Sequence, residues 1–225
     1  MCTHGCVGST SVNKEYMTYR STGCNMVGSE HVTMVPSPPG QRWAAQVNGQ
    51  AVEVLAPSNA VLLDVLRDKV GTLGVKRGCD LGTCGCCAVM VDGTPVLSCL
   101  TLAGQVEGAS ITTVEGLSDG AHLAPIQTCF ATHGGSQCGF CTPGFLISSQ
   151  ALLDRNPHPS RDDIAEAIEG NLCRCTGYQQ IIDAVEAAAA LHRGESESPA
   201  PASSPHPDPH PSGPEEPTMP PGHAK

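Results

Sequence analysis

The sequence has few aromatic residues, few basic residues and no long apolar run. Aromatic residues make up 3% of the chain, and 12 Lys and Arg stand against 22 Asp and Glu, which gives a net charge of -10. A chain of this charge repels a phosphate backbone and has few rings on which bases could stack, so we expect no nucleic-acid partner. No apolar run reaches the roughly 18 residues that a membrane-spanning helix needs. The N-terminal region also has no export signal, so we expect a cytoplasmic protein with no membrane span.

Cysteine, in contrast, is abundant. The chain has 13 Cys among 225 residues. An odd number cannot pair completely into disulfides within one chain. In a cytosolic protein, many cysteines indicate metal binding or redox chemistry more often than disulfides. The composition therefore predicts a protein that binds a metal or carries electrons.

Composition and pattern divide the chain into four segments. Residues 1–43 are polar and lack a sustained apolar period, so we expect a flexible N-terminal extension. Residues 194–225 hold ten of the 19 prolines, and such a segment buries too little apolar surface to offset its ordering entropy, so we expect a disordered tail. Between them, 44–117 reads as strand-rich and 118–193 as helical.

Two hairpin signals organise the strand-rich segment. Asn48-Gly49 and Asp92-Gly93 are dipeptides that favour the tight turns of β-hairpins. Ser58 is the expected N-cap of a helix between the hairpins, and Gly71 suits its C-terminal end. Two hairpins and one packed helix predict a small β-grasp sheet, with strands expected at 44–47, 51–55, 88–91, 96–100 and 110–114.

The helical segment contains four stretches with a helical apolar pattern. Pro143 suits the first turn of the second stretch, and Ser160 with Asp163 resembles a capping box for the third. The four helices are expected at 123–132, 143–154, 161–169 and 177–192. The fold class is therefore predicted to be α+β.

The first group of cysteines lies in a glycine-rich loop. Cys79, Cys84 and Cys87 follow the spacing C-x4-C-x2-C, and Cys99 comes after the second hairpin. This is the plant-type [2Fe-2S] pattern, and the glycines let backbone N–H groups approach the sulfurs. A four-cysteine zinc site is the alternative, although zinc sites more often use C-x2-C pairs at both ends. Cys86 adds a competing C-x4-C-x-C pattern.

The second group joins two short motifs that are far apart in sequence. Cys138 and Cys141 form C-x2-C, and Cys173 and Cys175 form C-x-C. On spacing alone, this set could hold zinc or an iron–sulfur cluster. Cys141 and Cys175 each lie at the start of an expected helix, and two helix N-termini favour an anionic cluster because of their partial positive charge.

The motifs GCDLGTCGCCAVMVDG, QCGFCTPGF and NLCRCTGYQQI closely resemble the small iron–sulfur subunit of molybdenum hydroxylases, the xanthine dehydrogenase, aldehyde oxidase and carbon monoxide dehydrogenase family. The resemblance covers roughly residues 46–192. It implies a β-grasp ferredoxin domain followed by a four-helix domain, each with one [2Fe-2S] cluster. The first cysteine set would ligate an outer cluster near FAD, and the second an inner cluster near molybdenum. Gln137 and Cys175 would contact the pterin.

The same resemblance implies a role and partners. The chain would carry no catalytic residue and would relay electrons from a molybdopterin centre, expected in the cytosine dinucleotide form, to FAD or an external acceptor. A large molybdopterin-binding subunit and a medium FAD-binding subunit would complete a heterotrimer or a dimer of heterotrimers. The alternatives are a free-standing ferredoxin-like carrier and a zinc-stabilised binding module. The resemblance leaves five cysteines without a role, namely Cys2, Cys6, Cys24, Cys86 and Cys129.

Overall fold

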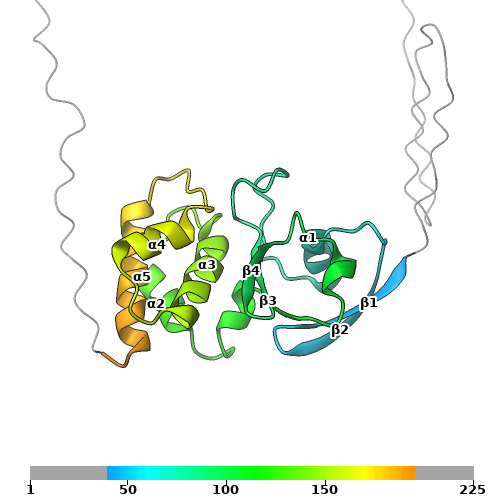
Figure 1. Cartoon of the computed structure of the whole chain (residues 1–225), viewed down its shortest axis with the longest axis horizontal. Helices are drawn as coiled ribbons and strands as arrows, with labels where there is room; N and C mark the ends of the chain where they lie inside the picture. The colour runs from blue at the N-terminus through cyan, green and yellow to red at the C-terminus, as the bar shows by residue number, and fades with distance from the viewer. Residues whose placement is uncertain (1–39, 196–225) are drawn as a thin grey trace, which may run out of the picture. The chain divides into compact units, whose positions relative to one another are not determined.

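The computed structural model describes residues 40–195. Most of the expected N-terminal extension, including Cys2, Cys6 and Cys24, and nearly all of the proline-rich tail lie outside these residues. The described residues form a mixed five-stranded sheet with helices, which agrees with the predicted α+β class (Figure 1). The strands fall within residues 41–112 and the four longer helices within residues 125–192.

The sheet is built from two hairpins and a fifth strand between them. Strands β1 (Gln41–Val47) and β2 (Gln50–Ala56) are antiparallel, as are β3 (Ala88–Val91) and β4 (Thr94–Leu97). Strand β5 (Ser110–Thr112) pairs parallel to β1 and antiparallel to β3, which gives the order β2-β1-β5-β3-β4.

Both predicted hairpin turns are confirmed by their backbone angles. Asn48 and Gly49 have φ values of 51° and 76°, and Asp92 and Gly93 have 48° and 78°. Two consecutive positive φ values define the tight turn that matches the twist of a hairpin. Asparagine, aspartate and glycine adopt this conformation most readily, which explains why the turns could be predicted.

The helix between the hairpins begins later than predicted. Its N-cap is Val61 rather than Ser58, because Val61 is extended (ψ 148°) and pairs with Leu102 as an isolated bridge. A short α-helix, α1 (Leu62–Asp64), then continues as the π-helix η1 (Val65–Val70). Gly71 ends it with φ 90°, as predicted. Its apolar side chains pack against β1, β3 and β5 in a buried core that includes Leu62, Leu63, Leu66, Trp43, Val89 and Ile111.

Four longer helices follow the short 3-10 turns η2 (Ala103–Val106) and η3 (Val114–Leu117). They are α2 (Pro125–Thr132), α3 (Thr142–Arg155), α4 (Arg161–Ile168) and α5 (Tyr178–His192). The predicted capping box at the start of α4 is present, because the Asp163 amide donates to the Ser160 hydroxyl. A second apolar core forms among these helices, and none of the helices described here is long and apolar enough to cross a membrane.

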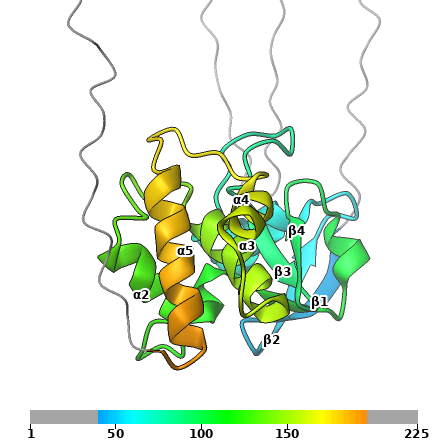
Figure 2. The same cartoon turned by 60° about the vertical axis from the view of Figure 1, so that its left-hand side comes forward.

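Strand β3 connects the sheet to the helices because both of its faces are buried. Val89 points into the core shared with α1, whereas Ala88 and Met90 pack against Ile147 and Ala151 of α3. Alternate residues of a strand face opposite sides of the sheet, so one short strand serves both cores. Figure 2 shows α3 beside β3 and β4. This contact places the loop before β3 close to the N-terminal ends of the helices.

Candidate metal centres

The first cysteine set is assembled by the loop before β3 and by the end of β4. Cys79, Cys84 and Cys87 lie on the loop, and Cys99 follows β4. Ser98 holds the two segments together: its amide N–H and its hydroxyl both donate to the Cys87 carbonyl, at 3.3 Å and 2.7 Å. The Asp92-Gly93 hairpin therefore returns Cys99 to the side of Cys87, as its sequence position indicated.

Hydrogen-bond donors surround the first sulfur of this set. The Thr83 hydroxyl donates to the Cys79 Sγ at 3.5 Å. With the backbone N–H groups of Leu81 and Thr83, it lowers the pKa of Cys79 to about 6. Burial instead raises the pKa of Cys99 to about 11. The loop thus stabilises a thiolate at its exposed end, as metal ligation requires.

The thiols of the first set are close neighbours in the fold. Cys84 lies near both Cys79 and Cys86, and Cys87 lies near Cys99. A [2Fe-2S] cluster takes two thiolates on each iron, so four neighbouring thiols suit it. A single zinc ion instead needs four ligands around one point.

Cys86 lies close to the first set, beside Cys84. Its side chain is buried, and its thiol donates to the Cys84 carbonyl at 3.6 Å. Burial and the neighbouring Cys84 raise the pKa of Cys86 to about 12. The spacing C-x4-C-x2-C favours Cys87 over Cys86 as the third ligand, and this choice stays a prediction.

The second cysteine set lies at the start of two helices. Cys141 is the N-cap residue of α3, and Gly177 is the N-cap residue of α5. The Gly177 amide donates to the Cys173 Sγ at 3.5 Å. Cys141 therefore lies at the start of α3, as predicted, whereas at α5 the sulfur that receives the Gly177 amide belongs to Cys173 rather than Cys175.

The thiols of the second set are also close neighbours in the fold. Cys138 lies near Cys175, and Cys141 lies near Cys173. The Phe140 amide lowers the pKa of Cys138, and burial raises the pKa of Cys141 to about 12. Among residues 40–195, no three Cys, His, Asp or Glu side chains gather closely enough to hold one metal ion. The thiol donors of both sets are chemically suited to an iron–sulfur cluster, and ligation of a cluster by these residues stays a prediction.

Tyr178 at the start of α5 fixes the loop of the second set. Its hydroxyl donates to the Asn171 carbonyl at 2.9 Å and accepts from the Cys173 amide at 3.1 Å. Its ring packs edge-on against Phe145 of α3, with centroids 5.9 Å apart. The two helices that begin at the cysteine motifs are thereby held together.

Gln137 lies on the surface beside this set. A Cβ added to Gly177 would lie 3.3 Å from the Gln137 Nε2, which places the amide over the start of α5. The side chain is exposed, so its donors and acceptors face outward. A contact between Gln137 and a pterin stays a prediction.

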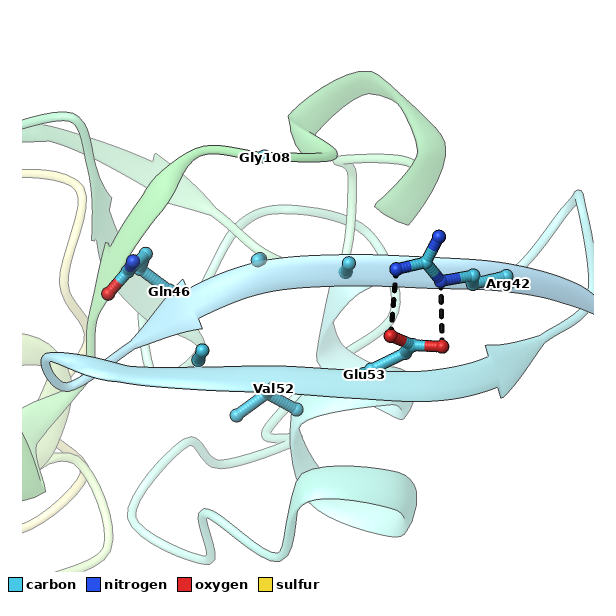
Figure 3. A pocket seen from close by; sticks show the side chains of 8 residues that line it. Arg42, Gln46, Val52, Glu53 and Gly108 are labelled. Atoms are coloured by element: carbon cyan, nitrogen blue, oxygen red, sulfur yellow. Dashed lines mark hydrogen bonds and ion pairs between the residues drawn. The ribbon is translucent and has the colours of Figure 1, made fainter.

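A hollow of about 270 Å³ is lined in part by Gly82, Thr83 and Gly85 of the loop that carries the first cysteine set. Another hollow, of about 440 Å³, lies on the β1–β2 hairpin and is lined by no cysteine (Figure 3). Arg42 and Glu53 in its lining are ion-paired with each other, at 2.7 Å between Nε and Oε1. Because the two charges neutralise one another, this hollow offers little to hold a charged substrate.

Sequence reasoning did not identify Ser98, Thr83, Tyr178 or Asn171 as residues that shape the sites. Thr83 lies within the first motif and Tyr178 within NLCRCTGYQQI, so their positions were visible but their donor roles were not. Ser98 directly precedes a ligand candidate, which was a usable signal. Asn171 bonds to a residue 86 positions away, and only the folded chain shows that contact.

Two family models match the chain. A 2Fe-2S iron-sulfur cluster binding domain matches residues 41–130, and a [2Fe-2S] binding domain matches residues 113–186. Together they cover both cysteine sets.

Curated relatives resemble the chain over the same region. It is 51% identical over 140 residues to the nicotine 6-hydroxylase small subunit of Paenarthrobacter nicotinovorans, covering 62% of this chain and 84% of the relative. It is 45% identical over 142 residues to the nicotinate dehydrogenase small FeS subunit of Eubacterium barkeri, covering 63% and 90%.

Solved structures resemble it as well. Quinoline 2-oxidoreductase from Pseudomonas putida matches with a TM-score of 0.66 and 48% identity, over 69% of this chain and 98% of that one. Aldehyde oxidoreductase from Desulfovibrio desulfuricans matches with a TM-score of 0.67 and 46% identity, over 69% of this chain. The match spans 17% of that longer protein.

Proposed function

Because the chain belongs to the family of small iron–sulfur subunits of molybdenum hydroxylases and serves as an electron-transfer subunit, we propose that its two cysteine sets ligate two separate [2Fe-2S] clusters. Cys79, Cys84, Cys87 and Cys99 hold the outer cluster. Cys138, Cys141, Cys173 and Cys175 hold the inner cluster. Cys86 ligates neither.

The observation that carries this proposal is that the fold gathers each set of cysteines from separate segments. Ser98 bonds to the Cys87 carbonyl and so holds Cys99 beside the first loop, and the Gly177 amide at the start of α5 donates to the Cys173 Sγ. The eight cysteines form no disulfide that would compete with ligation. Free thiols in this number also support a reducing compartment, so we place the protein in the cytoplasm.

The clusters supply one-electron chemistry when bound, and this chain's residues set the conditions for it. Backbone amides and the Thr83 hydroxyl donate to the outer sulfurs. The Gly177 amide and the start of α3 at Cys141 present partial positive charge to the inner sulfurs. Such donors stabilise negative charge on a cluster and therefore favour its reduced form.

Exposed apolar side chains beside each set support docking onto partner subunits. Leu81 and Leu100 at the outer set are 78% and 61% exposed, and Phe140 between two inner-set cysteines is 47% exposed. Large exposed apolar residues that gather near a site indicate an interface. We propose that the outer set faces a medium FAD-binding subunit and that the inner set faces a large molybdopterin-binding subunit, with Gln137 and Cys175 against the pterin.

The assembly that we propose is a heterotrimer or a dimer of heterotrimers. Its pterin is the cytosine dinucleotide form that the family resemblance implies. When bound, the two clusters held by these cysteines would carry electrons one at a time from a molybdenum centre on the large subunit to FAD or an external acceptor. Within residues 40–195 we assign no residue that acts on the substrate.

Metal analysis of the purified native protein tests the proposed clusters. We expect about four irons per chain and visible absorbance from the thiolate-ligated clusters. A colourless protein containing zinc would contradict the proposal and support the binding-module alternative. Size-exclusion chromatography of the untreated protein tests the partners: we expect it to elute with two larger chains, whereas a lone species of 23.2 kDa would support a free-standing carrier.

A further inference from the structure

The loops that carry the two cysteine sets are joined directly. The Leu172 amide, next to Cys173, donates to the Cys84 carbonyl at 3.0 Å. The Asn171 side-chain Nδ2 donates to the Gly85 carbonyl at 3.2 Å. These two hydrogen bonds join Asn171 and Leu172 of the inner loop to Gly85 and Cys84 of the outer loop. They therefore fix the spacing between Cys84, a proposed outer-cluster ligand, and Cys173, a proposed inner-cluster ligand.

Asn171 is hydrogen-bonded to three different segments at this junction. It is 3% exposed. Its Oδ1 accepts from the Ser148 hydroxyl at 2.9 Å, and its carbonyl accepts from the Tyr178 hydroxyl. Its amide therefore has a donor on one side and the Gly85 carbonyl on the other, which leaves a single orientation for the side chain.

The packing at Gly85 and Gly144 shows how close this contact is. A Cβ at Gly85 would lie 2.5 Å from the Asn171 Nδ2. A Cβ at Gly144 on α3 would lie 2.3 Å from the Gly85 carbonyl oxygen and 3.0 Å from the Asn171 Nδ2. Glycine at both positions leaves room for the asparagine to reach the loop, so the side chain and its two glycines form one interlocked unit.

We propose that Asn171 is a positioning residue for electron transfer: it holds the Gly85 carbonyl of the outer loop against the inner loop and so fixes the separation and relative orientation of the two clusters. This inference rests on the proposed ligand sets. Asn171 touches neither a proposed ligand sulfur nor the substrate, and acts only through the backbone of the outer loop. Loss of the contact would leave the backbone bond from Leu172 to Cys84 to join the loops, so their separation and relative orientation would change while each set kept its four cysteines.

Two substitutions remove the donor in different ways. Asn171→Ala deletes the whole amide. Asn171→Asp keeps the size and the acceptor for Ser148, but places a carboxylate oxygen against the Gly85 carbonyl. Ser148→Ala is the matched control, because it removes the neighbouring hydrogen bond and leaves Nδ2 on Gly85.

The measurement is low-temperature EPR of the fully reduced holoenzyme, supported by iron content. In the unmodified protein we expect two cluster signals with a magnetic splitting between them. Asn171→Ala and Asn171→Asp should keep full iron but change the splitting and slow oxidation of the inner cluster by the outer one, while Ser148→Ala should leave both unchanged. An unchanged splitting in both Asn171 variants would overturn the inference.

Other outcomes are also decisive. If the Asn171 variants lose the iron of both sets, the residue serves folding and the positioning role is wrong. If Ser148→Ala changes the splitting as much as Asn171→Ala does, the contact to Gly85 is not what matters. Failure of the proposed ligand sets is recognised separately, because the unmodified protein would then lack two cluster signals.

Discussion

Replacing Gly85 by alanine should strongly destabilise the junction between the two loops. Gly85 has φ +68°, a conformation that costs an L-residue about 1–2 kcal/mol. The new Cβ would also lie 2.5 Å from both the Gly170 carbonyl oxygen and the Asn171 Nδ2. Overpacking against backbone costs about 1–3 kcal/mol more, because the carbonyl cannot rotate away like the end of a flexible side chain. The two contributions together predict a loss of about 2–5 kcal/mol.

Gly93→Ala provides the matched control. Gly93 has φ +78°, but a Cβ there would meet nothing within 4 Å. The control therefore carries the backbone strain without the collision, and the difference between the two variants isolates about 1–3 kcal/mol of overpacking. For a chain of this size, that difference corresponds to about 2–12 °C in melting temperature.

The assay is anaerobic thermal unfolding of the holoprotein, followed by far-ultraviolet circular dichroism and by visible absorbance of the clusters. We expect Gly85→Ala to melt below Gly93→Ala and to lose its visible absorbance at the same lower temperature. Equal melting temperatures for the two variants would refute the close approach of Gly85 to the Asn171 loop.

Three further predictions concern single positions. Cys86→Ala should keep about four irons per chain, and loss of half of them would make Cys86 a ligand. In metal-free protein at pH 7, Cys79 should be alkylated faster than Cys99, because Thr83 lowers the pKa of Cys79 to about 6 while burial raises that of Cys99 to about 11. Because the pKa of Cys79 is lower in the folded protein than the ordinary thiol value of 9.0, its thiolate stabilises the fold fully at pH values above 9.0. This stabilisation is lost as the pH falls through about 6. Thr83→Val should raise the labelling pKa, and mass spectrometry that showed equal rates for the two thiols would contradict this. Gly144→Ala should destabilise the protein by about 1–3 kcal/mol in chemical denaturation, whereas no loss would contradict the approach of α3 to the outer loop.

Local chemistry made several elements predictable from the sequence. The two hairpin turns depend on dipeptides that accept positive φ, and the start of α4 depends on a serine and an aspartate three residues apart. The three cysteine motifs were recognisable because ligand spacing within each motif is local. These features need no knowledge of the rest of the fold.

Features that depend on distant contacts were missed or misplaced. Ser58 has good N-cap chemistry, but the bridge between Val61 and Leu102 keeps the chain extended past it. Strand β4 ends at Leu97 rather than at residue 100, because Ser98 turns to the Cys87 carbonyl. Such partners are set by tertiary structure, which no local pattern reports.

The most direct test of the account is an EPR comparison of Cys99→Ser and Cys173→Ser in the reduced holoenzyme. Cys99 belongs to the proposed outer set and Cys173 to the proposed inner set. We expect two rhombic signals from the unmodified protein, with Cys99→Ser altering one and Cys173→Ser altering the other. If either substitution altered both signals or neither, the assignment of the eight cysteines to two separate clusters would be wrong.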